Sequence, residues 1–203
     1  MGQHVNYKQR YRTKQARFWA SSYEDKRPEL TNAQRKMLSH YDNATLYNDS
    51  IVAQIVKRFQ KQDAIVIYVP DHGEECYEEN RGFICRNHSA EIDWPLAHYE
   101  FEIPFWIYCS PKYIRNHRDI YRQIRKVKDK RFMTDALPHL LLYLAGIETP
   151  TYKEEYNILS PKYDEMRPRI LKNSADYDKL RDAHLEKIKK EESKKVKKKE
   201  RRN

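Results

Sequence analysis

Apolar residues are concentrated in two short runs, each of which predicts a buried β-strand. The first, residues 64–69, reads Ala-Ile-Val-Ile-Tyr-Val. An uninterrupted, largely β-branched run of this kind is typical of a strand that is buried on both faces, as in a parallel sheet. The second, residues 103–109, stops at the turn signal Ser110-Pro111. We expect the two strands to be neighbours in one sheet.

Two longer stretches have the periodicity of helices. Residues 31–60 carry apolar side chains at the i, i+3, i+4 spacing of an amphipathic helix, with Thr31 or Asn32 as its cap. Residues 135–145 are rich in leucine and are followed by Gly146, a common helix terminator. Because such helices pack on sheets, the pattern predicts an α/β fold with a mostly parallel sheet flanked by helices.

The remaining segments are mainly polar. Residues 1–18 and 74–98 show neither period and are expected to be loops, and long ordered loops tend to carry function. Residues 148–174 contain three prolines and indicate an irregular surface segment, whereas residues 175–203 indicate a charged helix that ends in a lysine-rich tail. Asp42-Asn43 lies among the apolar positions of the first helix, which predicts a kink or a buried, hydrogen-bonded turn.

Positive charge is concentrated at the C-terminus. Residues 187–202 hold ten basic and three acidic residues, whereas the formal net charge of the whole 203-residue chain is +10. The rest of the chain is therefore only weakly basic, which argues against a nucleic-acid-binding surface on it. We expect the tail to be solvated, with a membrane-surface or phosphate-binding role as the alternative. The length fits one domain, and no stretch reaches the roughly 20 apolar residues of a membrane span.

Cysteine and glycine usage excludes several classes of protein. The three cysteines, Cys76, Cys85 and Cys109, are too few and too irregularly spaced for a zinc knuckle or a disulfide-rich scaffold. Cys76 and Cys85 would bridge only in an oxidising compartment, and the sequence leaves both states open. The four glycines include no Gly-x-Gly or phosphate-loop spacing, so a glycine-loop nucleotide binder is excluded.

Potential metal ligands follow the first predicted strand directly, at Asp71 and His72, and Gly73 allows the backbone to turn there. In open α/β sheets ligands bind at the carboxyl ends of strands, and a carboxylate with an imidazole suits zinc or manganese better than calcium. A simple turn also fits this triplet. His4 lies in the first loop, where a solvated side chain is the ordinary interpretation, and His88 lies in the long loop, which can fold back over the strand edge.

Seven motifs occur in a fixed order along the chain. They are Met1-Gly2-Gln3-His4, Tyr7-Lys8-Gln9-Arg10-Tyr11, Tyr41-Asp42-Asn43, Tyr47-Asn48-Asp49, Tyr68-Val69-Pro70-Asp71-His72-Gly73-Glu74, His88 and Ile103-Pro104-Phe105-Trp106. As an ordered set they resemble the carboxyl-terminal part of the catalytic domain of lipid A type phosphoethanolamine transferases, from the sulfatase-like branch of the alkaline phosphatase superfamily. The resemblance covers residues 1–180 and implies a fold that is incomplete at its N-terminus, followed by a charged tail over residues 181–203.

The resemblance implies roles for four residues. Asp71 and His72 match the Asp-His pair that binds the catalytic zinc in the family, and His4 and His88 match histidines that line its active site near substrate or a second metal. A divalent cation neutralises the charge of a phosphodiester and lowers the pKa of the attacking hydroxyl. Nearby histidines stabilise the transition-state oxygens or protonate the departing group. No cofactor other than the metal is implied.

The chain also departs from the family pattern. Gln3, Arg12 and Pro70 replace a small residue, a proline and a serine, and none of these positions is a ligand. The threonine nucleophile of the family and a further acidic ligand lie in strands before the motif of His4, and neither they nor the family's membrane helices have a counterpart here. We therefore expect a truncated or split product, and we expect this chain alone to turn over little or nothing.

Three functions remain open. The first is that the parent protein is a metal-dependent phosphoethanolamine transferase, anchored in the inner membrane with its catalytic domain in the periplasm. It would move phosphoethanolamine from a phospholipid to a lipid A or sugar acceptor and would bind no nucleic acid. The second is a sulfatase or phosphodiesterase-type hydrolase of the same superfamily. The third is a non-enzymatic basic module whose tail binds anionic surfaces.

Overall fold

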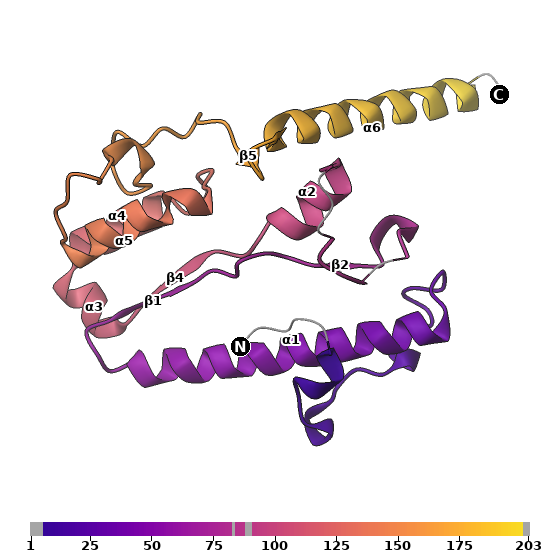
Figure 1. The fold of residues 1–203 in the computed structure, drawn as a ribbon, viewed down its shortest axis with the longest axis horizontal. Coiled ribbons are helices and arrows are strands. Elements are labelled where there is room, and N and C mark those ends of the chain that lie inside the picture. The colour runs from indigo at the N-terminus through magenta and orange to yellow at the C-terminus, as the bar shows by residue number, and fades with distance from the viewer. Residues whose placement is uncertain (1–5, 83, 88–90, 201–203) are drawn as a thin grey trace. The chain divides into compact units, whose positions relative to one another are not determined.

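The computed structural model describes residues 6–82, 84–87 and 91–200 of the chain. They fall into two compact units, Met1–Lys112 and Tyr113–Asn203, which we describe separately (Figure 1).

The first unit contains one long helix, α1, over Asn32–Phe59, which confirms the predicted amphipathic helix. Thr31 rather than Asn32 is its N-cap: the Thr31 hydroxyl accepts a hydrogen bond from the Gln34 N–H at 3.2 Å, and the Gln34 side chain accepts from the Thr31 N–H at 2.8 Å. This reciprocal pair is a capping box, which satisfies two donors that helix formation leaves open. In the second half of α1 the large apolar side chains are partly exposed, among them Ile51, Ile55 and Phe59.

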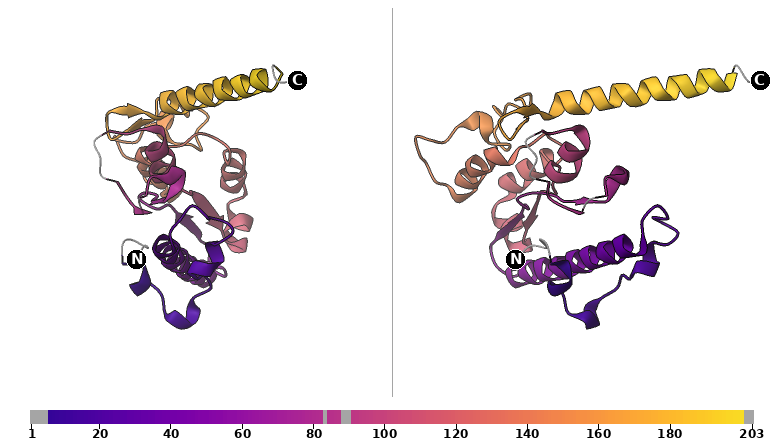
Figure 2. Two further views of the ribbon diagram at one scale, coloured as in Figure 1. Left: turned by 90° about the vertical axis from the view of Figure 1, so that its right-hand side faces the viewer. Right: turned by 45° about the vertical axis from the view of Figure 1, so that its right-hand side comes forward.

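The segment before α1 folds into three short 3-10 turns: η1 (Tyr7–Gln9), η2 (Thr13–Gln15) and η3 (Ala20–Tyr23). Of these, η1 and η3 pack against α1, as Figures 1 and 2 show from three sides. Residues 6–18, the described part of the loop expected over residues 1–18, are therefore ordered and pack on α1. Tyr7 is buried there.

Asn43 is the residue that fastens this segment to α1. Its side-chain oxygen accepts from the backbone N–H groups of Arg17 (2.6 Å) and Phe18 (3.1 Å), and its amide nitrogen donates to the carbonyls of Phe18 and Ser39, both at 2.8 Å. The helix continues through this position without interruption. Neither the predicted kink nor the predicted turn at Asp42-Asn43 is present, although Asn43 is buried and hydrogen-bonded as the second alternative required.

Replacing Asn43 by alanine is expected to lower the free energy of unfolding of the first unit by about 3 kcal/mol, because it leaves two backbone donors without their acceptor. Urea denaturation followed by circular dichroism measures the loss. Gln54→Ala is the matched control, since Gln54 is an exposed amide of the same helix that bonds only within it. Equal midpoints for the two variants would show that Asn43 does not hold the segment.

The two predicted strands are neighbours, as expected. β1 (Ile65–Tyr68) pairs with β4 (Trp106–Cys109), and the rings of Tyr68 and Trp106 stack at the end of the pair with centroids 5.1 Å apart. The pair is antiparallel, however, whereas the sequence predicted a parallel neighbour for the first strand. β4 is not that parallel neighbour. The expectation of burial on both faces is also not met, because all four residues of β1 are only partly buried. An apolar run does not by itself specify the direction of the neighbouring strand.

The long loop expected over residues 74–98 is more structured than predicted. Its elements within the described residues are β2 (Glu75–Cys76), η4 (Glu78–Asn80), β3 (Ile84–Cys85) and the first part of α2 (Trp94–Phe101). The strands β2 and β3 form an antiparallel pair, and α2 packs against β2.

The start of α2 has a local sequence signal, but the apolar periodicity did not predict a helix there. The Asp93 carboxylate accepts from the Leu96 N–H at 3.0 Å, and Pro95 lies in the first turn, where its missing N–H costs nothing. An N-cap followed by proline predicts a helix start even where the helix is too short for a clear apolar stripe.

All three cysteines are free thiols. In the β2–β3 pair Glu75 lies opposite Cys85 and Cys76 lies opposite Ile84. Cys76 and Cys85 are thus one step out of register and point to opposite faces of the pair. Cys76 instead belongs to a hydrophobic core of the first unit, whose buried members are Tyr23, Leu30, Leu38, Cys76 and Tyr77.

The second unit is mainly helical. The predicted leucine-rich helix is α5, and it ends at Gly146, which has a positive φ of 66°. The predicted charged helix is α6, a straight helix in Figure 2. Residues 157–160 are buried, so the surface segment expected over residues 148–174 also supplies part of the core. The elements from the end of the first unit onward are α3 (Pro111–Asn116), α4 (Arg118–Lys126), η5 (Thr134–Ala136), α5 (Leu137–Ala145), η6 (Glu154–Tyr156), β5 (Ile170–Leu171), β6 (Ala175–Asp176) and α6 (Tyr177–Glu200).

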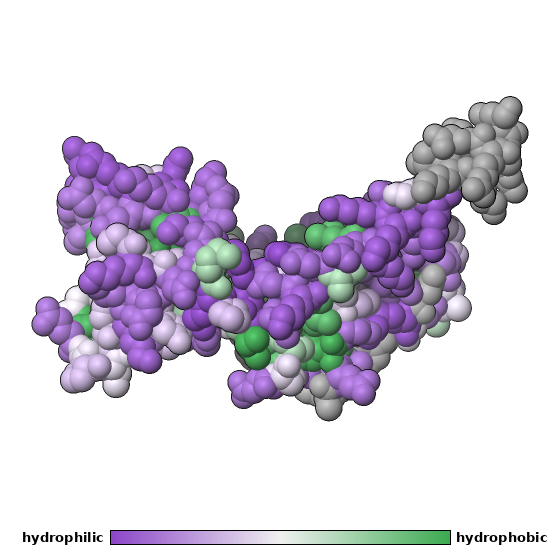
Figure 3. Space-filling view, turned by 90° about the horizontal axis from the view of Figure 1, so that it is seen from above, coloured by the Kyte–Doolittle hydropathy of each residue, from purple (hydrophilic) through white to green (hydrophobic). Residues whose placement is uncertain are grey.

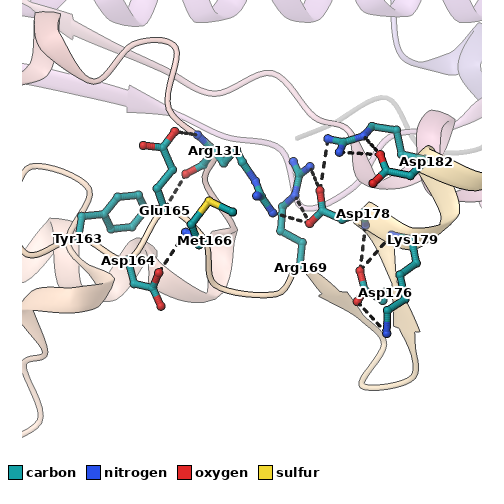
Figure 4. A network of polar contacts seen from close by, with 11 residues as sticks. Arg131, Tyr163, Asp164, Glu165, Met166, Arg169, Asp176, Asp178, Lys179 and Asp182 are labelled. Carbon is teal, nitrogen blue, oxygen red and sulfur yellow. Dashed lines mark hydrogen bonds and ion pairs between the residues drawn. The ribbon is translucent and has the colours of Figure 1, made fainter. Parts of the chain in front are cut away.

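One carboxylate organises the start of α6. Asp178 accepts two bonds from the guanidinium of Arg169, at 2.6 and 3.2 Å, and it is also bonded by Arg131 (Figure 4). Arg181 lies 3.3 Å from the same carboxylate. The hydrogen bonds from Arg169 hold the pKa of Asp178 below its usual value. Asp178 therefore joins the β5–β6 hairpin, α6 and the segment after α4.

Asp178→Asn is expected to destabilise the second unit by about 2 kcal/mol at neutral pH, because a charge-assisted acceptor is lost. The folded-state pKa of Asp178 is depressed, so its contribution is complete above the unfolded pKa of about 4 and disappears as the pH falls through the lower folded value. Thermal unfolding of wild type and variant at pH 7 and pH 3 checks this, and the difference should shrink at pH 3. Asp182→Asn is the control, since the Asp182 side chain is 63% exposed against 20% for Asp178 and pairs with Arg181.

The face in Figure 3 is predominantly hydrophilic, in agreement with a sequence in which 34% of the residues are charged.

Among the described residues, no helix combines the length and the apolar character that crossing a bilayer requires.

Candidate metal-binding site

Asp71 and His72 follow β1 at the point where the strand ends. The Asp71 side chain is 92% exposed and that of His72 is 14% exposed, and Asp71 Oδ2 lies 3.8 Å from His72 Nε2. In a four-coordinate zinc site with bonds of 2.0–2.2 Å, two donor atoms lie roughly 3.4 Å apart. The spacing of this pair therefore fits one edge of a zinc site.

The second ring nitrogen of His72 sets the orientation of the imidazole. Nδ1 lies 2.7 Å from the carbonyl oxygen of Gly73. Because a carbonyl only accepts, Nδ1 carries the proton and the lone pair of the neutral ring is on Nε2, the nitrogen that faces Asp71. A ligating histidine usually has such a partner on its other nitrogen, so this hydrogen bond prepares His72 to bind a metal.

Gly73 holds the loop against the end of α2. Its N–H donates to the carbonyl of Glu100 at 2.8 Å, and a Cβ added at Gly73 would lie 2.2 Å from the carbonyl oxygen of Tyr99. Only a glycine fits at this position, because the two backbones approach each other too closely for a Cβ atom. The Asp71-His72 pair is therefore carried by a loop that packs directly on α2.

Glu74 connects the loop to η1 and α1. The hydroxyl of Tyr7 donates to Glu74 Oε2 at 2.8 Å, and the ring of Tyr7 meets that of Tyr41 edge-on, with centroids 5.3 Å apart. Burial, followed by the hydrogen bond to Glu74, raises the pKa of Tyr7 far above its usual value, so Tyr7 stays a neutral donor. Three of the motifs recognised in the sequence thus meet at one place.

Two buried acids behind the loop were not predicted from the sequence. Glu75 and Glu100 are each only 1% exposed. Glu75 forms an ion pair with Arg81 at 2.5 Å, and Arg81 also bonds Asp93 at 2.8 Å. Burial raises the pKa of Glu75, the charge of Arg81 opposes this rise, and the charge of Glu100 adds to it. Glu75 lies in the loop predicted over residues 74–98, where a run of acids ordinarily indicates solvated side chains, and Glu100 lies just beyond it.

The two other predicted site residues, His4 and His88, lie outside the described residues. Within the described part of the chain, no group of three or more histidine, cysteine, aspartate or glutamate side chains is arranged to hold a metal ion. Asp71 and His72 by themselves supply two donors, half of a four-coordinate zinc site.

Comparison with known protein families defines the class of the protein. The chain belongs to the sulfatase family, which matches residues 1–147.

Particular relatives are phosphoethanolamine transferases. The chain is 31% identical to phosphoethanolamine transferase EptC of Escherichia coli O18:K1:H7 over 168 residues, which is 81% of this chain and 28% of that protein. It is 31% identical to the Kdo(2)-lipid A phosphoethanolamine 7''-transferase of Escherichia coli K12 over 133 residues, which is 64% of this chain and 22% of that protein. The chain thus spans less than a third of the length of these relatives.

Solved structures show the same fold. The C-terminal periplasmic domain of EptC from Escherichia coli matches with a TM-score of 0.70 at 28% identity, covering 89% of this chain and 51% of that domain. The zinc complex of that domain matches with a TM-score of 0.69 at 28% identity, covering 89% of this chain and 50% of that domain. The predicted α/β, sulfatase-like fold class is confirmed, and the chain corresponds to about half of the solved domain.

Proposed function

We propose that this chain contributes the Asp-His edge of the metal site in a phosphoethanolamine transferase of the cell envelope. The parent protein would be held in the inner membrane and would act in the periplasm. It would transfer phosphoethanolamine from a phospholipid to a lipid A or sugar acceptor. Residues 1–180 would form the C-terminal part of the catalytic domain, and residues 181–203 would form a charged tail.

The observation that carries this proposal is the arrangement of Asp71 and His72 at the end of β1. The His72 Nε2 lone pair faces the Asp71 carboxylate, and the bond from Nδ1 to Gly73 fixes that orientation. A relative with 28% identity over most of this chain has been solved with zinc, which favours zinc as the metal.

The residues divide the chemistry between them. When bound, a divalent cation supplies charge neutralisation at the phosphodiester and a lowered pKa for the attacking hydroxyl. Asp71 and His72 would hold it, and the loop on α2 would keep their donors oriented. His4 and His88 are proposed to contact the phosphoryl oxygens or to protonate the leaving group. The nucleophile and the remaining metal ligands would come from polypeptide other than this chain.

The test is expression of the complete coding region that contains this chain in Escherichia coli that lacks its own phosphoethanolamine transferases. Mass spectrometry of extracted lipid A is expected to show the added mass of phosphoethanolamine, and its loss when His72 is replaced by alanine. Stable protein without any added mass on lipid A or core sugar would overturn the proposal. Release of sulfate or phosphate from a soluble ester would instead favour a hydrolase.

A further inference from the structure

Three large apolar side chains form an exposed row along the second half of α1. Ile51, Ile55 and Phe59 are 36%, 44% and 43% exposed, and their spacing of four residues places them on one face of the helix. Val52 and Val56, each one position further along, are partly buried. The described residues therefore cover only part of the apolar stripe of α1. A contiguous apolar row marks an interaction surface, whereas single scattered apolar residues do not.

The strand next to α1 has an open edge. α1 packs against β1, and in the described part of the chain β1 pairs with one strand, β4 (Figure 1). The Ser110 N–H donates to the Ala64 carbonyl at 3.0 Å, so this carbonyl points toward β4. Because bonded positions alternate in an antiparallel pair, the N–H and C=O groups of Ile65 and Ile67 point to the other edge. An apolar strand with such an edge is a template for a further strand.

We propose that the open edge of β1 and the exposed face of α1 form one docking surface. Its occupant is the part of a sulfatase-like domain that has no match in this chain. The inference rests on the proposed function, which assigns the chain to a larger catalytic domain. The occupant adds a strand parallel to β1, and its apolar side chains cover Ile51, Ile55 and Phe59.

The size of a solved relative points to this occupant. The chain matches the periplasmic domain of Escherichia coli EptC over 89% of its own length but over only 51% of that domain. The apolar run of β1 predicts a parallel neighbour, and β4 is antiparallel. A two-stranded sheet is also marginally stable by itself, so β1 and β4 need further strands or helices to cover them. The unmatched half of the domain can supply both.

The docking surface lies beside the candidate metal ligands. The carboxyl ends of parallel strands meet at one edge of a sheet, and Asp71 and His72 follow the carboxyl end of β1. A parallel strand beside β1 therefore delivers the loop that follows it to the same place. Asp71 and His72 supply two donors of a four-coordinate site, and the docked polypeptide is positioned to supply others.

The test makes the same substitutions in two proteins, this chain alone and the product of the complete coding region that contains it, in one detergent buffer. Ile55→Lys places a charge on the proposed docking surface. Leu46→Lys is the matched control, because Leu46 is 40% exposed and lies on the opposite side of α1, nine residues or about two and a half turns before Ile55. Thermal unfolding reports on stability, and hydrogen exchange by mass spectrometry reports on β1.

We expect Ile55→Lys to change the melting temperature of the chain alone by less than about 2 °C, as is usual for an exposed site. In the complete protein it should lower the melting temperature by about 5 °C or more, because the docked polypeptide buries the new charge. Leu46→Lys should have a small effect in both proteins. Peptides that cover Ile65 and Ile67 should exchange faster in the chain alone than in the complete protein.

Several results would overturn the proposal. One is an equal effect of Ile55→Lys and Leu46→Lys on the complete protein, and another is unchanged exchange across β1. A coding region that adds no further sulfatase-like sequence would also contradict it. So would a dimer of the chain that Ile55→Lys dissociates without affecting the complete protein, since the occupant would then be a second copy.

Folding failures leave the test decisive. If the complete protein with Ile55→Lys does not fold, Ile55→Ala and Leu46→Ala are compared in its place, and a selective loss in Ile55→Ala supports the docking surface. If the chain alone does not fold, the two lysine variants of the complete protein decide.

These measurements do not depend on phosphoethanolamine transfer. Selective destabilisation by Ile55→Lys in a complete protein that leaves lipid A unmodified would retain the docking surface and reject the proposed function. Transfer to lipid A by a complete protein that tolerates Ile55→Lys as well as Leu46→Lys would do the reverse.

Discussion

Replacing Gly73 by alanine is expected to displace the loop of Asp71 and His72 and to destabilise the first unit by about 3 kcal/mol or more. The added Cβ would lie 2.2 Å from the Tyr99 carbonyl oxygen and 3.4 Å from the Glu100 Cα. Both are backbone atoms, so the contact is relieved only if the loop separates from α2. That movement also breaks the hydrogen bond from Gly73 to Glu100. Urea denaturation and zinc titration of the variant measure the two effects.

Gly82→Ala is the matched control for this experiment. Gly82 has a positive φ of 67°, and a Cβ there meets no atom within 4 Å. Its substitution should cost only about 1 kcal/mol, the strain of a left-handed conformation, and should leave zinc binding unchanged. If Gly73→Ala were as mild as Gly82→Ala, the close packing of the loop on α2 would be wrong.

Replacing His72 by alanine is expected to reduce zinc affinity by more than about 100-fold, more than the loss of a partner behind the ligands causes. His72 supplies the only neutral nitrogen donor of the proposed pair, and Asp71 alone is a largely exposed carboxylate. Overall stability should fall less than in Gly73→Ala, because removal of the imidazole ends the hydrogen bond to the Gly73 carbonyl and leaves the bond from Gly73 to Glu100 in place. Competition titration and urea denaturation, run on the same samples, separate the two quantities.

His98→Ala is a suitable control for His72→Ala. His98 belongs to α2, its side chain is 42% exposed, and it pairs with Glu102. Its removal should leave zinc affinity at the wild-type value. Retention of zinc binding in His72→Ala, or equal losses in both variants, would show that the metal is bound somewhere other than at the end of β1.

The sequence predicted those elements whose signal is local and long. The helix α1 has an apolar stripe over its whole length together with a capping box, and α5 has a dense leucine pattern closed by Gly146. The two central strands were found because each is a short apolar run bounded by polar or turn-forming residues. Their mutual direction was not found, since it depends on how the chain travels between them.

The candidate site was predicted only in part, because some of its residues are brought together by contacts that are distant in the sequence. Asp71 and His72 stand out because they closely follow an uninterrupted apolar run. Glu75 and Glu100 do not stand out, because their burial depends on α2 folding back onto β2, and α2 is too short to show a clear apolar period.

The pairing of β1 with β4 has a consequence for the order of assembly. β1 and the loop of Asp71 and His72 leave the ribosome before α2 and before the strand that pairs with β1. The N-terminal turns and α1 make their contacts over shorter separations in the chain, and such contacts form faster. The candidate ligands are thus synthesised before the structure that orients them, and we expect the site to be among the last parts of the first unit to become ordered.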